Sequence, residues 1–474
     1  MLRAEVRHLP LQRVSAPPSA IRAFLEEHRQ ELLGVMAAAG GAGLRLSRRH
    51  AAIMDSLLVQ LFQGALACTP GASSNVVLGA VGGYGRQLLA WKSDLDIRFI
   101  TVGSTKALGK QVDAVLYPLW DAGMSIGHQV VSVADVVEAA RHDLPTATAL
   151  LDLRVLAGDA RIAAALSERA YATLFSEARL PKFLDRLEAQ TEARQQRYGD
   201  SVYLLEPDVK SGRGGLRDID CALWAARARF RTSDLKELEK LDLLSARQVE
   251  QVSAAADFLW AIRNHLHARA ARRSDRLTFA EQEALAPRLG YGVAARPGVS
   301  EVQRIGVAVE EMMSDYYRHA RNIARVREQL IGRARRREPK RFSRSVVLGP
   351  GLVKSEGGVA LRDPADLARN PVIALRLYAT AVEHDLPVLS RTRDAIAHAA
   401  SEPAFGEALR GNAEASSAFI SLVACSRSAR FRNGSILGEL HEVGLLLAMI
   451  PEFTPVVGRV HHDMYHVYTV DVHS

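Results

Sequence analysis

Cysteine is scarce in this sequence. The chain of 474 residues holds three (Cys68, Cys221 and Cys425), which lie far apart and form no CxxC pair. This spacing argues against a disulfide framework and against a cysteine-based zinc site, and it fits a reducing compartment. Long apolar runs are missing as well. No segment approaches the roughly 18 apolar residues that span a bilayer, and the N-terminus lacks the apolar core of a signal peptide. We therefore expect a cytoplasmic protein without membrane contact.

Neither sign of charge dominates the composition. Lys and Arg number 61 against 53 Asp and Glu, a formal net charge of +8, and hydrophobic residues make up 48%. This is an ordinary globular mixture, and its length predicts about two to four domains. The basic residues are mostly arginines, which bind phosphate oxygens in pairs and so favour anionic partners such as nucleotides. Aromatic residues are only 6% and form no stacking platform, so no nucleic-acid partner is expected.

The hydrophobic pattern divides the chain into helical and mixed segments. A helical stretch over 20–66 precedes a strand, a glycine turn and a second strand in VVLGAVGGYGRQLLAWKSDLDIRFITV. Several long amphipathic helices up to about residue 330 favour a bundle. A short β-like section and further helices follow. The predicted domains are an N-terminal helical segment, a domain with the glycine turn, a helical domain, a linker with further helices and a short C-terminal segment, with the boundaries 1–69, 70–160, 161–335, 336–455 and 456–474.

The most informative chemistry lies where Gly82 and Gly83 precede the run Ser93-Asp94-Leu95-Asp96. In a strand over LDIRFI alternate side chains share a face, so Asp94 and Asp96 would point into one cleft. Two such carboxylates repel each other unless a cation binds them, and Mg²⁺ is favoured because it prefers hard oxygen ligands. The two glycines allow the backbone to approach a triphosphate. Together these features indicate an in-line nucleotidyl transfer.

Two further residues of this region are candidates. Asp152, a lone acid in LLDLRVLAG, is the candidate third carboxylate and general base, with a helix-surface or cap position as the alternative. Arg98 shares the face of Asp96 and suits either phosphate contact or a position on an edge strand. A dinucleotide-binding turn is disfavoured, because the glycines lack the G-x-G-x-x-G spacing and the acids follow after about ten residues instead of about twenty.

A second glycine-rich segment, YLLEPDVKSGRGGLRDID, combines glycines with basic residues. Such loops suit phosphate oxygens, but the ending of a P-loop is absent and a helix-connecting loop is the alternative. Lys210 and Arg217 are the residues we expect to contact phosphate. Elsewhere, His265 and His267 lie two apart on a predicted helix, which favours structural roles. Four of the 15 histidines fall within the last fourteen residues, a density that suggests metal ligands.

At these residues the chain resembles a known family, the bacterial PII uridylyltransferase/uridylyl-removing enzymes of the nucleotidyltransferase superfamily. The resemblance lies in GGYGR…SDLDI, EPDVKSGRGGLRDI, IRNHLHARAARRSDRLTF and IPEFTPVVGRVHHDMYHVYTVDVH, in this order. It implies transfer of UMP from UTP to a tyrosine of the signalling protein PII. It also implies an α+β fold with a polymerase-β-like mixed sheet, and Mg²⁺ held by Asp94 and Asp96. The nucleotide-binding residues that we expect are Gly82, Gly83, Arg86, Ser93, Lys210 and Arg217.

The resemblance extends to the C-terminal histidines. HVYTVDVHS is similar to the opening of the family's HD-type phosphohydrolase domain, with His473 at the first histidine of that domain. The later metal ligands and the two glutamine-sensing ACT domains are not found before Ser474. We therefore expect an incomplete HD domain, no uridylyl-removing activity and no direct glutamine sensing. Asp152 stands where the family usually has Glu.

Three alternatives stay open at this point. An adenylyltransferase of glutamine synthetase would carry two transferase units and an R-L-R-P stretch after its third acid, where this chain has Arg154-Val155-Leu156-Ala157. A non-catalytic relative would bind PII or nucleotide without turnover. A tRNA-directed nucleotidyltransferase could use the basic run over 325–344. The residues themselves do not distinguish UTP from ATP, so uridine rests on the resemblance alone.

Overall fold

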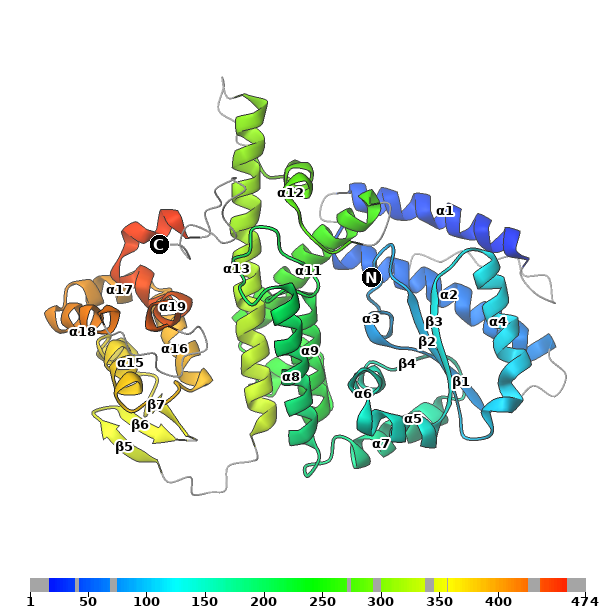
Figure 1. Cartoon of the computed structure of the whole chain (residues 1–474), viewed down its shortest axis with the longest axis horizontal. Coiled ribbons are helices and arrows are strands. Elements are labelled where there is room, and N and C mark those ends of the chain that lie inside the picture. Colours follow the sequence, from blue (N-terminus) through cyan, green and yellow to red (C-terminus); the bar gives the residue numbers. More distant parts are fainter. Residues whose placement is uncertain are drawn as a thin grey trace. The chain divides into compact units, whose positions relative to one another are not determined.

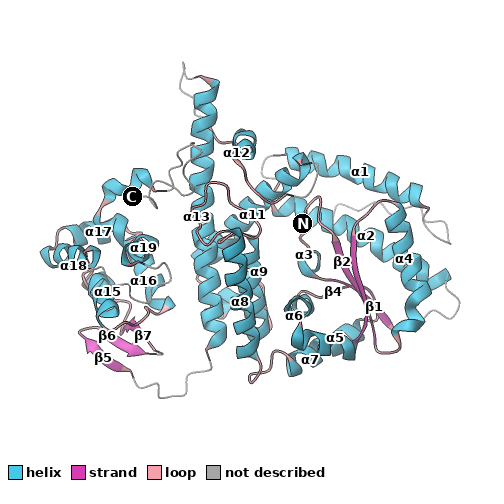
Figure 2. Cartoon of the chain, viewed as in Figure 1, coloured by secondary structure: helices cyan, strands magenta, loops and turns pink. Residues whose placement is uncertain are grey.

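The chain divides into two compact units, Met1–Arg335 and Arg336–Ser474 (Figure 1). Helices dominate both units, as Figure 2 shows. Within the part of the chain that the structure describes, no helix is long and apolar enough to cross a membrane. The computed structural model describes residues 17–38, 42–68, 75–270, 274–292, 300–336, 345–355, 357–424 and 435–457.

A four-stranded mixed sheet lies in the first half of the N-terminal unit. The spatial order of its strands is β3-β2-β1-β4. β2 runs parallel to β3, and β1 is antiparallel to both β2 and β4. This arrangement confirms the predicted α+β fold with a mixed sheet. β2 is an internal strand, so the edge-strand alternative for Arg98 is wrong. The strands are β1 (Val76–Ala80), β2 (Leu95–Thr101), β3 (Ile126–Ser132) and β4 (Arg154–Gly158).

The side chains of β2 alternate between two faces of the sheet. Leu95 and Ile97 pack in a core with α1, α2 and α4, whereas Ile100 packs in a separate core with α5 and α7. By the same alternation Asp96 and Arg98 lie on the Ile100 face. The helices around the sheet are α1 (Pro18–Ala37), α2 (Leu44–Cys68), α3 (Gly82–Gly85), η1 (Thr105–Leu108), α4 (Gly109–Asp121), α5 (Val133–His142), α6 (Leu144–Leu151) and α7 (Ala160–Thr173).

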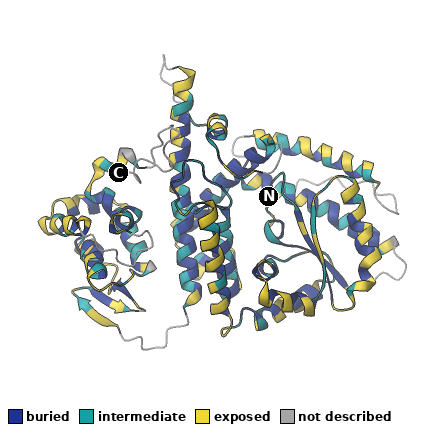
Figure 3. Ribbon diagram, in the orientation of Figure 1, coloured by how far each residue is buried: buried dark blue, intermediate teal, exposed yellow. Residues whose placement is uncertain are grey.

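A bundle of long helices makes up the second half of this unit. α9 packs against α8, α11 and α13, and Figure 3 shows buried residues along much of α13. α11 begins with a capping box, in which Ser245 and Gln248 exchange side-chain-to-backbone hydrogen bonds. The helices of the bundle are α8 (Leu180–Tyr198), α9 (Leu216–Phe230), α10 (Leu235–Lys240), α11 (Ala246–Arg269), α12 (Phe279–Leu285), η2 (Pro287–Leu289) and α13 (Glu301–Arg335).

Contacts between α11 and the start of α2 join the bundle to the domain that holds the sheet. The side-chain amide of Asn264 donates to the Ala42 carbonyl at 2.8 Å and to the Ser47 hydroxyl at 3.0 Å. The backbone N–H of Leu44 donates to Oδ1 of Asp257 at 2.8 Å. Asn264 is buried, so its hydrogen bonds must be satisfied within the protein and they fix α11 against α2. As a result, the bundle holds α9 and α11 opposite the sheet.

The C-terminal unit has a core of its own, formed by a small antiparallel sheet and short helices. Its strands follow one another in the order β5-β6-β7. The elements of this unit are β5 (Val346–Gly349), β6 (Leu352–Ser355), β7 (Gly358–Leu361), α14 (Asp366–Arg369), α15 (Ile373–Glu383), α16 (Ser390–Ala400), α17 (Pro403–Arg410), α18 (Ala413–Val423), α19 (Ile436–Glu442), α20 (Leu445–Met449) and η3 (Pro451–Val456).

Candidate active site

A cleft of about 470 Å³ lies between the sheet and the helices α6, α9 and α11. Residues far apart in the sequence meet in it, and the predicted catalytic and nucleotide-binding residues are brought together there. The predicted residues that line the cleft are Gly82, Gly83, Arg86, Ser93, Asp94, Asp96, Asp152, Lys210 and Arg217. His473, the predicted first histidine of the HD domain, lies outside the described residues.

The glycine turn follows β1 directly. Gly82 has a φ of +60°, a left-handed conformation that glycine adopts without the steric penalty of a side chain. Gly82–Gly85 then form a single helical turn, α3, and the turn borders the cleft. The backbone of this turn is therefore close to the space that a ligand would occupy.

The two acids border the same cleft as this turn. The hydroxyl of Ser125 donates to Oδ1 of Asp94 at 2.6 Å. Asp96 pairs in register with Gly127 of β3, where a Cβ atom would lie 2.5 Å from Oδ1 of Asp96. A Cβ atom on Gly82 would lie 3.5 Å from Oδ2 of the same carboxylate. The Asp96 carboxylate thus lies between the glycine turn and a glycine of the neighbouring strand, in space that a side chain at residue 127 would fill.

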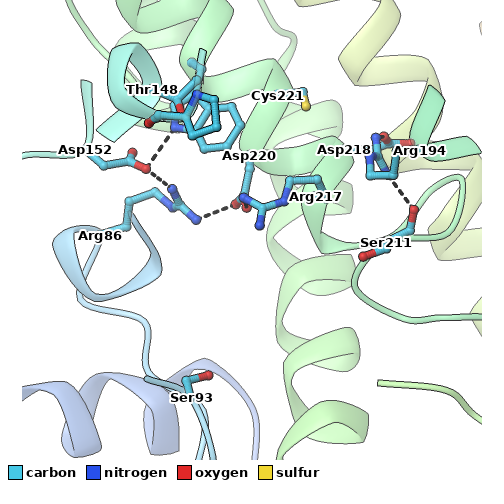
Figure 4. Close-up of polar contacts among 12 residues, drawn as sticks. Arg86, Ser93, Thr148, Asp152, Arg194, Ser211, Arg217, Asp218, Asp220 and Cys221 are labelled. Carbon is cyan, nitrogen blue, oxygen red and sulfur yellow. Dashed lines mark hydrogen bonds and ion pairs between the residues drawn. The ribbon is translucent and has the colours of Figure 1, made fainter. Parts of the chain in front are cut away.

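Asp152 is the C-cap residue of α6 and is buried, with 3% of its surface exposed. Its carboxylate forms an ion pair with Arg86 (Figure 4), and Nε1 of Trp224 donates to its Oδ2 at 2.9 Å. Burial raises the pKa of Asp152 to about 6, although Arg86 and Trp224 act in the opposite direction. Among the described residues no group of three His, Cys, Asp or Glu side chains could hold a metal, so Asp152 borders the same cleft as Asp94 and Asp96 without forming a three-residue metal site with them. The metal role of Asp152 stays a prediction.

Arg86 links the glycine turn to the helical bundle. Besides its contact with Asp152, its Nη2 donates to Oδ1 of Asp220 on α9 at 2.7 Å. Nη1 of Arg217 donates to the other oxygen of Asp220 at 3.2 Å, and the Arg217 guanidinium lies 5.5 Å from the centre of the Trp224 ring. Figure 4 shows Arg86 between the two aspartates. Both arginines that were predicted to bind nucleotide, Arg86 and Arg217, are therefore held in place by carboxylates.

Sequence reasoning missed Asp220 and Trp224. The helical spacing of Arg217, Asp220 and Trp224 within α9 places all three on one side of the helix. This spacing was the available signal, but the partners Arg86 and Asp152 belong to a distant part of the sequence.

Two aspartates accept hydrogen bonds from the backbone of the glycine-rich segment before α9. Oδ1 of Asp208 accepts hydrogen bonds from the backbone N–H groups of Lys210 at 3.0 Å and Ser211 at 2.6 Å. Oδ2 of Asp218 accepts one from Gly214 at 2.8 Å, and Oδ1 of Asp218 is paired with Arg194. These contacts fix the loop that places Lys210 at the cleft. The segment therefore connects two helices and also contributes to the cleft wall.

Two charged residues that sequence reasoning missed, Arg263 and Asp275, lie next to Ser93 and His267. Nε of Arg263 donates to Oδ1 of Asp275 at 2.8 Å, and its Nη2 lies 3.4 Å from the Ser93 hydroxyl. The backbone N–H of Lys92 donates to Nδ1 of His267 at 3.3 Å, so Nε2 carries the proton and donates to Asp275 at 2.9 Å. Arg263 and His267 hold the pKa of Asp275 well below its usual range, against the effect of burial. These contacts give His267 the structural role predicted for it.

The donor set of the cleft fits a magnesium ion. Mg²⁺ is usually bound through one or two carboxylates together with substrate phosphates and water, and not by a cage of protein ligands alone. Asp94 and Asp96 supply two hard oxygen donors beside a turn that can approach phosphate. Magnesium itself stays a prediction.

One comparison with known proteins bears on this cleft. Residues 182–331 match the family model described as GlnD PII-uridylyltransferase. The match covers most of the helical bundle and includes Lys210, Arg217, Asp220, Trp224 and Arg263 of the cleft. The glycine turn and the acid pair lie before the matched residues, and they face the same cleft.

Proposed function

We propose that the protein transfers UMP from UTP to a tyrosine of PII and releases pyrophosphate, because residues 182–331 match the family model described as GlnD PII-uridylyltransferase. The observation that carries this proposal is the shared cleft. A glycine turn, two neighbouring aspartates and basic residues of the matched domain border one space of about 470 Å³, and these are the groups that a nucleotidyl transfer requires.

The residues of the cleft would have distinct roles in this reaction. Asp94 and Asp96 would hold Mg²⁺, which when bound supplies positive charge to the phosphates and to the attacking oxygen. Gly82 and Gly83 would let the backbone approach the triphosphate, and Ser93 also lines the cleft. Arg86, Lys210 and Arg217 would orient the phosphates by hydrogen bonding and charge. UTP, tyrosine and Mg²⁺ belong to the proposal.

Asp152 would accept the proton of the attacking hydroxyl. A general base works best when its pKa is near the working pH, and burial raises the pKa of Asp152 to about 6. Such a carboxylate is ionised at neutral pH and is more basic than an exposed aspartate. Its contacts with Arg86 and Trp224 fix its orientation in the cleft wall.

The test is to incubate the full chain with PII, Mg²⁺ and each of the four nucleoside triphosphates in turn. Intact mass analysis of PII should show the increment of UMP with UTP alone, and fragmentation should place it on a tyrosine. Asp96→Asn is the matched control, since it removes one predicted metal ligand with little change in volume. An increment with another nucleotide, or none with any, would contradict the proposal. Transfer of AMP to glutamine synthetase would establish the adenylyltransferase alternative.

A further inference from the structure

A buried arginine, Arg98, lines the cleft. It follows Asp96 by two residues on β2, so both side chains project from the same face of the sheet. Arg98 is paired in register with Gln129 of β3, which also borders the cleft. Only 5% of its surface is exposed, yet Arg98 lines the cleft. The guanidinium is therefore shielded from bulk water but adjacent to the space that a ligand would fill.

Within the described part of the chain, one nitrogen of the Arg98 guanidinium has no hydrogen-bond partner. Nη1 is buried and has no hydrogen-bond partner among the described residues. By contrast, Arg86, Arg217 and Arg263 of the same cleft each contact a carboxylate. A buried charged donor without a partner destabilises the folded state, because it has lost its hydration. Such a group lowers the stability of the folded protein unless a ligand supplies the missing hydrogen-bond acceptor.

The two acids whose charges act on Arg98 have other contacts. The negative charges of Asp143 and Asp96 interact electrostatically with the Arg98 guanidinium, but neither acid forms an ion pair with it among the described residues. Oδ2 of Asp143 accepts hydrogen bonds from the backbone N–H of Thr146 at 2.8 Å and from its hydroxyl at 2.5 Å, which caps α6. Asp96 lies between Gly82 and Gly127. Engagement of Asp96 by a metal ion would leave Arg98 with still less compensating negative charge.

We propose that Arg98 is a phosphate-binding residue, whose guanidinium binds anionic oxygens of the triphosphate in the cleft. This inference rests on the proposed function and adds a residue to it. Arginine offers only donors, in a planar arrangement that matches phosphate oxygens. A triphosphate carries several negative charges, and its oxygens supply the missing acceptors. The smallest probe with this chemistry is inorganic pyrophosphate, which is also the expected leaving group.

The test measures equilibrium binding to the full chain by calorimetry, with Mg²⁺ and without PII, so that no transfer occurs. The ligands are UTP, pyrophosphate and uridine, and the variants are Arg98→Met and Arg98→Lys. A hydrogen-bonded contact between charged groups predicts roughly 10- to 100-fold weaker binding of UTP and pyrophosphate to Arg98→Met. Arg98→Lys should recover part of this loss, because it restores the charge without the planar pair of donors. Uridine should bind all three proteins equally.

A matched control is Arg161→Met, which removes an arginine of α7 whose side chain is 90% exposed. It should leave all three affinities unchanged. The melting temperature without ligand separates phosphate binding from a structural role. Loss of an unpartnered buried charge should leave the melting temperature of Arg98→Met unchanged or raise it, whereas loss of a structural arginine would lower it.

Each outcome decides the inference. Wild-type affinity for pyrophosphate in Arg98→Met, or an equal loss of uridine binding, would overturn it. A lower melting temperature with unchanged affinities would assign Arg98 a structural role and also overturn it. The proposed function fails separately, because a wild-type chain that binds UTP through Arg98 but modifies no PII would refute transfer and leave the phosphate contact intact.

Discussion

Replacing Asp152 by Asn should stabilise the protein at neutral pH. Asp152 is 3% exposed, and burial raises its pKa from 3.8 to about 6. An acid whose pKa is raised on folding stabilises the folded state when it is protonated, and this contribution is lost as the pH rises through the folded value. The shift corresponds to about 3 kcal/mol between the two protonation states.

Asparagine mimics the protonated form of Asp152 at every pH. Arg86 would keep its contact with Asp220, and Trp224 could still donate to the amide oxygen. We therefore expect Asp152→Asn to exceed the wild type in free energy of unfolding by about 3 kcal/mol at pH 7.5 and by about 1.5 kcal/mol at pH 5. Burial of the charge thus dominates over its pairing with Arg86.

The assay is urea unfolding followed by tryptophan fluorescence at the two pH values. Asp113→Asn, which removes an exposed carboxylate of α4, controls for the general effect of one lost negative charge. If Asp152→Asn were less stable than the wild type at pH 7.5, the Arg86 pair would outweigh burial and the reasoning would be refuted. A difference that is the same at both pH values would refute the raised pKa.

Three further predictions concern single residues. Asp94→Asn and Asp96→Asn should each abolish UMP transfer without lowering the melting temperature, and transfer activity in either variant would contradict the proposed metal ligands. Gly127→Ala places a Cβ atom 2.5 Å from Oδ1 of Asp96, so transfer should fall at least about tenfold, whereas unchanged kinetics would show that the carboxylate can move freely. Asp275→Asn leaves two buried partners without their acid, and urea unfolding should show a loss of about 3–5 kcal/mol; a loss under about 1 kcal/mol would show that the ion pair adds little.

The alternation in LDIRFI predicted that Asp94 and Asp96 share one face of a strand, but the observed strand β2 begins at Leu95 and includes only Asp96. Side chains two apart in a strand share a face whatever the strand order, so the common face of Asp96 and Arg98 follows from local sequence. The order of the strands in the sheet, by contrast, does not follow from local sequence. Whether Arg98 belongs to an internal strand depends on the pairing of β2 with both β1 and β3, which the pattern of one segment does not encode.

The contacts of Arg86 are a second feature that the pattern of one segment does not encode. Its two acids lie 66 and 134 residues away in the sequence, and no periodicity within one segment relates such positions. Arg86 was predicted to bind nucleotide, and it lines the cleft. The sequence did not indicate the ion pairs with Asp152 and Asp220 that hold it. Asp220 and Arg217 are separated by one helical turn, so the sequence pattern could predict their mutual contact but not their contacts with other segments.

The cleft depends on contacts between the domain that holds the sheet and the matched helical domain. Arg86 of the glycine turn bonds Asp220 of α9, and Arg263 of α11 approaches Ser93 beside the acid pair. His267 accepts a hydrogen bond from the backbone of Lys92 in the same loop. Each contact pairs a group next to the predicted nucleotide site with one inside residues 182–331. The helical domain therefore acts on the geometry of the site itself, because it fixes the turn and the loop that carry Gly82 and Asp94.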